Sequence, residues 1–319
     1  MFAFQLRMWL LMAALFAIIY AVVVVIGTMM GLTDFYFYLP VSFGIMFIQY
    51  LIGPKIVEWT MQIKYVKREE SPKVYRMIED LAQRANLPMP KVCISRLPIP
   101  NAFAFGRGVR DGRVCVTEGI MNLLNDEELK AVLGHELTHI KNRDVLTITL
   151  LSVIPMIMYR IAWHFMFYGH RRDERHSNTI LVGIVAFIFY FITNLLVLYA
   201  SRVREYFADR GSIEMGNRPA ALASALYKLV YGSARIDRGV LKEAEGLKAF
   251  FINDPSRALN EIRELSQLDL DKSGTIDSSE LALLKNKKIH LNFGDRVLES
   301  LSTHPNMLKR IQQLSKAAY

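Results

Sequence analysis

The sequence predicts a mainly α-helical membrane protein that also carries an α+β domain with a small antiparallel sheet. Three observations support this prediction. Apolar residues make up 52% of the 319 residues, which is more than an ordinary soluble protein carries. Several uncharged runs are long enough to cross a bilayer core of about 30 Å. Short β-like runs and capped helical stretches between them suit a domain that faces water.

Residues 1–54 are predicted to form a transmembrane hairpin. No charged residue occurs between Arg7 and Asp34, and the core of this run, "WLLMAALFAIIYAVVVVIG", is almost wholly apolar. After the linker "GLTD", a second uncharged run covers residues 35–54. A cleaved signal peptide is the competing interpretation of the first run, but the run is long for one and lacks a clear small-residue cleavage site.

Basic residues predict the orientation of the hairpin. The linker has none, whereas Lys55, Lys64, Lys67 and Arg68 follow the second run, and this pattern is typical of the cytoplasmic side. We therefore expect a multi-pass protein of the cell membrane whose later domain faces the cytoplasm. The net charge of +9 fits attraction to the anionic lipid bilayer. No aromatic-interleaved basic motif indicates nucleic acid.

Residues 55–144 are predicted to form the first part of the cytoplasmic domain. A helix begins after Ser71, with Pro72 in its first turn, and ends before Pro88. The runs "KVCISR", "NAFAFG" and "VCVTEG" then predict the three strands of the antiparallel sheet. "GIMNLL" starts a helical stretch. The next helix, "NDEELKAVLGHELTHIKNRD", begins at a capping box formed by Asn125 and Glu128.

Residues 145–201 contain two further hydrophobic segments. Pro155 and Arg160 interrupt the third, whereas the fourth has no charge from Ser177 to Ser201. The loop between them, "HRRDERH", is too basic for a typical external loop. The two segments therefore either form a second hairpin or only partly enter the membrane. Residues 202–319 would be the second part of the cytoplasmic domain, with helices separated at Gly216 and Pro219.

The stretch "HELTH" places two histidines and a glutamate at the spacing of a zinc site. His135 and His139 are four residues apart and so share one face of a helix, with Glu136 beside them. Imidazole is a good zinc ligand, and a neighbouring carboxylate can serve as a general base. The alternative is a polar helix face that matches the pattern by chance.

A third ligand is expected in "SRVREYFADR", just past the fourth hydrophobic segment. Glu205 is the candidate, and Asp209 follows one turn later on the same helical face. Metal-bound histidines usually donate their second ring N–H to a carboxylate, which Asp209 would supply. The alternative is an exposed ion-pair face formed by these two residues with Arg202, Arg204 and Arg210.

With these motifs the sequence resembles the HtpX-type membrane zinc endopeptidases, relatives of the CaaX prenyl proteases. "HELTH", "SRVREYFAD" after two hydrophobic segments, the two amino-terminal spans and "NAFAFG" carry the resemblance. It extends to about Asp237 and resumes at "STHPNMLKRI". It implies a gluzincin-like metalloprotease domain with one catalytic zinc ion, ligated by His135, His139 and Glu205. Glu136 would then be the catalytic acid/base and Asp209 an orienting residue.

The resemblance also implies roles for two other segments. His304, with Arg310, would stabilise the oxyanion that develops on the scissile carbonyl. The alternative for His304 is a structural residue beside Pro305. The strand residues Asn101, Ala102, Phe103 and Ala104 would lie at a sheet edge and pair with an extended substrate through the backbone. Their alternation of small and aromatic side chains equally fits ordinary sheet packing.

"DLDKSGTIDSSE", within an insertion at about 255–290, matches a calcium-binding EF-hand loop. Gly274 takes the turn position, and helices are expected on both sides, "SRALNEIRELSQL" before and "SSELALLKNKK" after. The alternative is an acidic turn that caps a helix at Ser278 or Ser279. In the EF-hand alignment the candidate Ca²⁺ ligands are Asp269, Asp271, Ser273, Thr275, Asp277 and Glu280.

The function expected from this sequence is zinc-dependent hydrolysis of peptide bonds at the membrane. The resemblance implies misfolded or damaged membrane proteins as substrates and a part in protein quality control. A calcium-responsive membrane adaptor without catalysis is the alternative, although the intact Glu136 counts against it. A transporter would need buried charges in the hydrophobic segments, and only Arg160 qualifies.

Overall fold

The computed structural model describes residues 61–144, 177–234, 268–285 and 293–317, with scattered residues in 47–59, in 147–166 and at Leu265. Most of the predicted hairpin, most of the third hydrophobic segment, the basic loop and the helix expected before the EF-hand-like loop lie outside these residues. The chain divides into two compact units, Met1–Ile52 with Leu146–Ala200 and Gly53–Val145 with Ser201–Tyr319.

The first unit contains most of α7 (Ser177–Glu214), which is continuous through the fourth hydrophobic segment. Among the described residues it provides the one helix that is long and apolar enough to cross a membrane, from Leu181 onward. Large apolar side chains at helical spacing lie exposed along it, as lipid-facing side chains would. These are Leu181, Ile184, Phe187, Ile188 and Phe191.

The second unit contains a four-stranded sheet. Its strands are β1 (Ile63–Tyr65), β2 (Lys91–Ser95), β3 (Ala102–Phe105) and β4 (Arg113–Thr117), in the order β1-β2-β4-β3. The β1–β2 and β3–β4 pairs are antiparallel, whereas β2 and β4 are parallel. The prediction of an antiparallel sheet was therefore wrong, and the sheet is mixed.

The path of the chain explains the mixed sheet. The segment 96–101 contains Pro98 and Pro100, which favour extended backbone, and it carries the chain past one strand position. β3 therefore lies at the edge, and β4 returns into the gap between β2 and β3. The return needs a tight turn, in which Gly106 adopts a φ of +138°. The strand order depends on pairing between distant segments. Strand propensity, which is local, does not predict that pairing.

The helices of the second unit follow the sequence prediction closely. α3 (Pro72–Arg84) has Ser71 as its N-cap, although the serine side chain makes no capping hydrogen bond. α4 (Glu118–Leu123) follows β4. α5 (Asp126–Lys141) begins at the predicted capping box, in which Asn125 and Glu128 each accept the other's backbone N–H.

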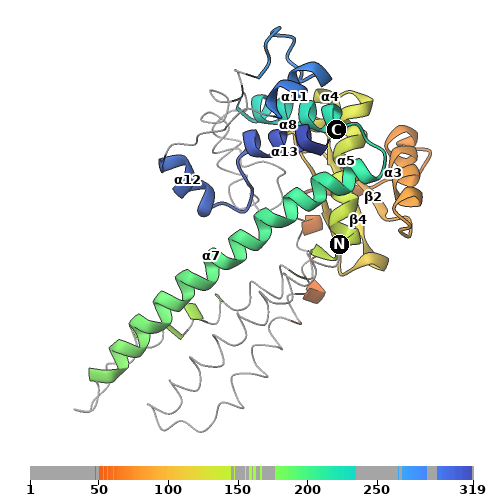
Figure 1. The fold of residues 1–319 in the computed structure, drawn as a ribbon. Helices are drawn as coiled ribbons and strands as arrows, with labels where there is room; N and C mark the ends of the chain where they lie inside the picture. The colour runs from red at the N-terminus through yellow and green to blue at the C-terminus, as the bar shows by residue number, and fades with distance from the viewer. Residues whose placement is uncertain are drawn as a thin grey trace. The chain divides into compact units, whose positions relative to one another are not determined.

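Carboxy-terminal helices of this unit pack against one another, and one of them packs against α5 (Figure 1). α7 ends near Gly216, whose φ of +89° suits glycine, and α8 (Pro219–Ala234) begins at the predicted proline. α8 packs against α5 and α13 (Met307–Ala317), and α11 (Ser278–Leu284) packs against α13. α12 (Phe293–Ser300) precedes the loop that carries His304. The mainly helical prediction is confirmed for the described residues.

Candidate metal centre

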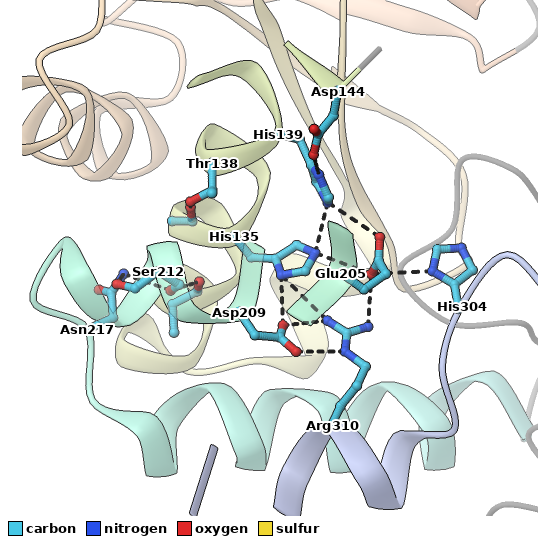
Figure 2. Close-up of polar contacts among 12 residues, drawn as sticks. His135, Thr138, His139, Asp144, Glu205, Asp209, Ser212, Asn217, His304 and Arg310 are labelled. Carbon is cyan, nitrogen blue, oxygen red and sulfur yellow. Dashed lines mark hydrogen bonds and ion pairs between the residues drawn. The ribbon is translucent and has the colours of Figure 1, made fainter. Parts of the chain in front are cut away.

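Small residues let α5 and α7 approach closely at the centre of the second unit. A side chain at Gly211 of α7 would clash with Thr138 of α5, and one at Gly134 of α5 would approach the Ser212 hydroxyl to 2.9 Å. Ser212 also donates a hydrogen bond of 2.6 Å to the Ala131 carbonyl. This contact places the histidines of α5 opposite the carboxylates of α7 (Figure 2).

The three predicted zinc ligands, His135, His139 and Glu205, lie close together here. The Nε2 atoms of His135 and His139 lie 3.1 Å apart. His135 Nε2 is 3.5 Å from Glu205 Oε2, and His139 Nε2 is 3.5 Å from the other carboxylate oxygen, Oε1. Zinc bound tetrahedrally at about 2.0–2.1 Å from each ligand atom needs separations of roughly 3.3 Å. Glu205 Oε2 is also buried and accepts no hydrogen bond among the described residues. The three side chains therefore fit a tetrahedral zinc ion with one position left for water.

Asp209, the predicted orienting residue, contacts the first histidine. Its Oδ1 lies 2.8 Å from His135 Nδ1, so the ring turns Nε2 toward Glu205. Burial alone would lower the pKa of His135, but the hydrogen bonds and charges of Asp209 and Glu205 raise this pKa to about 10. The arrangement thus favours positive charge at this position, whether on a proton or on a metal ion.

Arg310 lies behind this carboxylate. Its guanidinium has no exposed surface and donates to both oxygens of Asp209, at 2.9 and 2.6 Å. Nη1 lies 3.2 Å from Glu205 Oε2. Arg310 therefore joins α13 to two carboxylates of α7 and neutralises charge that would otherwise be buried without a partner.

Asp144 contacts the second histidine, His139. The sequence did not predict this role for Asp144. Its Oδ2 lies 2.7 Å from His139 Nδ1, and its Oδ1 lies 3.0 Å from Arg204 Nε. Burial would raise the pKa of Asp144, but the Arg204 charge and the His139 hydrogen bond hold it below its usual range. A signal was present in the sequence: Asp144 and Arg204 are opposite charges that flank two hydrophobic segments.

Glu136 lies beside the histidines and is 4% exposed. Burial raises the pKa of its carboxyl, while the positive charge of the two histidines opposes the shift. The backbone of Ala104, on β3, also favours the charged form through a hydrogen bond. The predicted general base thus contacts the predicted substrate strand, which lies at one end of the described sheet.

His304 also reaches the site, from the loop after α12. Its Nδ1 lies 3.3 Å from Glu205 Oε2, and neither ring nitrogen has a hydrogen-bond partner among the described residues. Arg202 of α7 donates to the carbonyls of Ser300 and Ser302, at 2.9 and 2.8 Å, and so fixes the start of this loop. The sequence suggested a role for Arg202 only in the alternative of an exposed ion-pair face.

The EF-hand-like loop forms a separate acidic cluster. Carboxylate oxygens of Asp269, Asp271 and Glu280 lie within 4.8 Å of one another. Gly274 has a φ of +79°, as its turn position requires. Asp277 is also the N-cap of α11 and forms a capping box with Glu280. The helix cap is therefore present, and calcium binding by the loop stays a prediction.

Comparisons with known proteins show the family of this chain. Residues 68–318 match the model of peptidase family M48. A "Protease HtpX homolog" of Methanothermobacter thermautotrophicus is 52% identical over 235 residues, which cover 74% of this chain and 89% of that protein. Another, of Moorella thermoacetica, is 41% identical over 224 residues, 68% of this chain and 74% of that protein.

A crystal structure of S. mikatae Ste24p is 16% identical, with a TM-score of 0.46, and the match covers 97% of this chain and 67% of that one. The resemblance to HtpX-type proteins that the motifs indicated is confirmed by the family match and the curated relatives. The chain belongs to peptidase family M48.

Proposed function

We propose that this chain is a membrane-bound zinc endopeptidase whose metal ion is held by His135, His139 and Glu205. The convergence of the two Nε2 atoms, 3.1 Å apart, on the Glu205 carboxylate, which has one oxygen 3.5 Å from each of them, carries the proposal. These separations are close to the roughly 3.3 Å between two ligand atoms of a tetrahedral zinc ion. Two imidazoles and one carboxylate are also a donor set that zinc favours when one position stays open for catalysis.

The remaining residues supply the proton chemistry. A bound zinc ion would polarise the peptide carbonyl and acidify a water molecule. Glu136 takes the proton from that water and later delivers it to the leaving amine. Its raised pKa suits this exchange, because a carboxyl group that titrates closer to neutral pH can both accept and return a proton.

His304 and Arg310 take different roles in this proposal. The His304 ring lies with Nδ1 3.3 Å from Glu205 Oε2, and neither ring nitrogen makes a hydrogen bond among the described residues, so the ring can donate to the oxyanion. Arg310 is fully buried and already donates to both oxygens of Asp209. We therefore assign Arg310 a positioning role in place of the oxyanion role that the sequence suggested.

The substrate is proposed to bind along β3. The strand is at the end of the strand order, and its residue Ala104 contacts Glu136 through the backbone. An extended peptide paired with this edge would present its carbonyls next to the general base. Misfolded membrane proteins are the proposed substrates, and α7 as a candidate membrane helix would bring the site close to them. A multi-pass topology with a cytoplasmic site remains the prediction from the charge pattern.

A metal-removal experiment tests the proposed function. The full chain in detergent should cleave unfolded casein, lose this activity when zinc is chelated, and regain it with added Zn²⁺ but not with added Ca²⁺. Zinc binding without any cleavage, on casein and on unfolded membrane proteins, would favour the adaptor without catalysis. Cleavage that survives complete zinc removal would contradict the proposal.

We also propose that the loop 269–280 takes up Ca²⁺ as a structural ion. The close carboxylates of Asp269, Asp271 and Glu280 and the left-handed backbone at Gly274 support this. Tyr227 of α8 donates to Asp269 at 3.0 Å, and Gln312 of α13 donates to the Leu284 carbonyl of α11 at 3.3 Å. Calcium would therefore order a segment that packs on two helices of the second unit.

A further inference from the structure

Each of the two proposed zinc-binding histidines contacts a carboxylate through Nδ1, and an arginine neutralises that carboxylate. The sequence predicted a carboxylate partner for only one histidine. His135 Nδ1 contacts Asp209, the orienting residue that the resemblance implied, and Arg310 neutralises Asp209. His139 Nδ1 contacts Asp144 at 2.7 Å, and Arg204 neutralises Asp144 at 3.0 Å. Figure 2 shows Asp209 and Asp144 approaching their histidines from opposite ends of the site.

We propose that Asp144 is the positioning residue for His139, and that Arg204 holds Asp144 in place. The inference rests on the proposed function, because it assigns a partner to one of the proposed zinc ligands. With Nδ1 donating to Asp144, the lone pair of His139 is confined to Nε2, which faces His135 and Glu205. A histidine whose other nitrogen is held in this way binds zinc more tightly.

The backbone turn after α5 places Asp144 next to His139. α5 ends at Lys141, and Arg143 then adopts a φ of +56°, which is uncommon for a residue other than glycine. This turn brings Asp144 back to His139, five residues earlier in the chain. Such a conformation persists when surrounding contacts hold it, and functional sites are where it is most often found.

Burial makes the Arg204 contact necessary. The side chain of Asp144 is 3% exposed and that of Arg204 is 10% exposed, so neither charge is well solvated. A buried carboxylate charge without a cation would be costly. Arg204 prevents this and keeps Asp144 available as an acceptor for the His139 N–H.

Zinc affinity and the spectrum of the cobalt-substituted chain test the inference. The full chain in detergent is compared with Asp144→Asn, Arg204→Gln and Arg204→Lys. The matched control is Glu128→Gln, which removes a buried carboxylate on α5 that pairs with Lys228 at 2.9 Å and touches no histidine. Thermal unfolding of each variant shows that it is folded.

We expect Asp144→Asn to raise the zinc Kd roughly 10–100-fold and to change the visible Co²⁺ absorption. Arg204→Gln should change the zinc Kd and the Co²⁺ absorption in the same direction as Asp144→Asn. Arg204→Lys should restore most of the zinc affinity that Arg204→Gln loses. Glu128→Gln should leave the zinc Kd and the Co²⁺ absorption unchanged. Wild-type affinity and spectrum in Asp144→Asn, or an equal loss in Glu128→Gln, would overturn the inference. A wild-type chain that binds no zinc would instead overturn the proposed function, and the inference with it.

Discussion

Arg310 and Asp209 form a fully buried pair in which the guanidinium donates to both carboxylate oxygens, at 2.9 and 2.6 Å. Arg310→Gln should lower the free energy of unfolding by about 3–5 kcal/mol, because it leaves buried carboxylate charge without a cation. The expected decrease is measured by thermal unfolding in detergent. Arg310→Lys keeps the charge but loses the paired geometry, so its effect should be smaller.

Arg210→Gln on α7, the helix that carries Asp209, is the matched control for this prediction. Arg210 pairs with Glu214 at 3.0 Å, but the two side chains are 72% and 49% exposed. Exposed pairs contribute about 0–1 kcal/mol, so this variant should unfold almost like the wild type. Equal stability of Arg310→Gln and Arg210→Gln would contradict the positioning role of Arg310.

His304→Ala tests the proposed oxyanion donor. Loss of such a donor typically lowers kcat by about 100-fold to 1,000-fold, while zinc stays bound because the three ligands remain. Casein cleavage and zinc content are measured on the same sample. A variant that loses its zinc would show that His304 supports the metal site, and unchanged kcat would remove it from the chemistry.

Gly211→Ala tests the close approach of α5 and α7. The added methyl group would clash with Thr138, so we expect overpacking to cost about 1–3 kcal/mol of stability and to weaken zinc binding. Gly294→Ala in α12 is the control, because no atom of the described residues lies within 4 Å of the added carbon. If both variants behave like the wild type, the two helices do not need this contact.

Asp271→Asn tests the calcium loop. The Asp271 side chain is exposed, so the variant should unfold like the wild type when calcium is chelated. Millimolar Ca²⁺ should raise the Tm of the wild type, because an ion that binds only the folded chain stabilises it, and should raise that of the variant less. No calcium effect on the wild type would leave the loop as a helix cap.

Local pattern was enough to predict the main features of the site. The spacing of His135 and His139, and that of Glu205 and Asp209, follows from the helical repeat and needs no tertiary knowledge. The capping box at Asn125 likewise depends on residues three apart and is present. Ser71, Gly216 and Pro219 also mark helix ends where the sequence predicted them.

Features that depend on distant parts of the chain could not be predicted in this way. The parallel pairing of β2 and β4 follows from the path of the chain between the strands, and β1 is only three residues long. The Asp144–Arg204 pair joins positions sixty residues apart, on either side of 145–201. The burial of Arg310 against Asp209 likewise depends on how α13 packs.

The central claim is that three ligands hold a zinc ion next to a catalytic carboxylate. Its most direct test is the zinc content of the wild type and of Glu136→Gln, measured with casein cleavage on the same samples. Glu136 is not a ligand in this account, so both chains should hold about one zinc ion, and only the wild type should cleave. Cleavage by Glu136→Gln at the wild-type rate, or a wild type without zinc, would contradict the account.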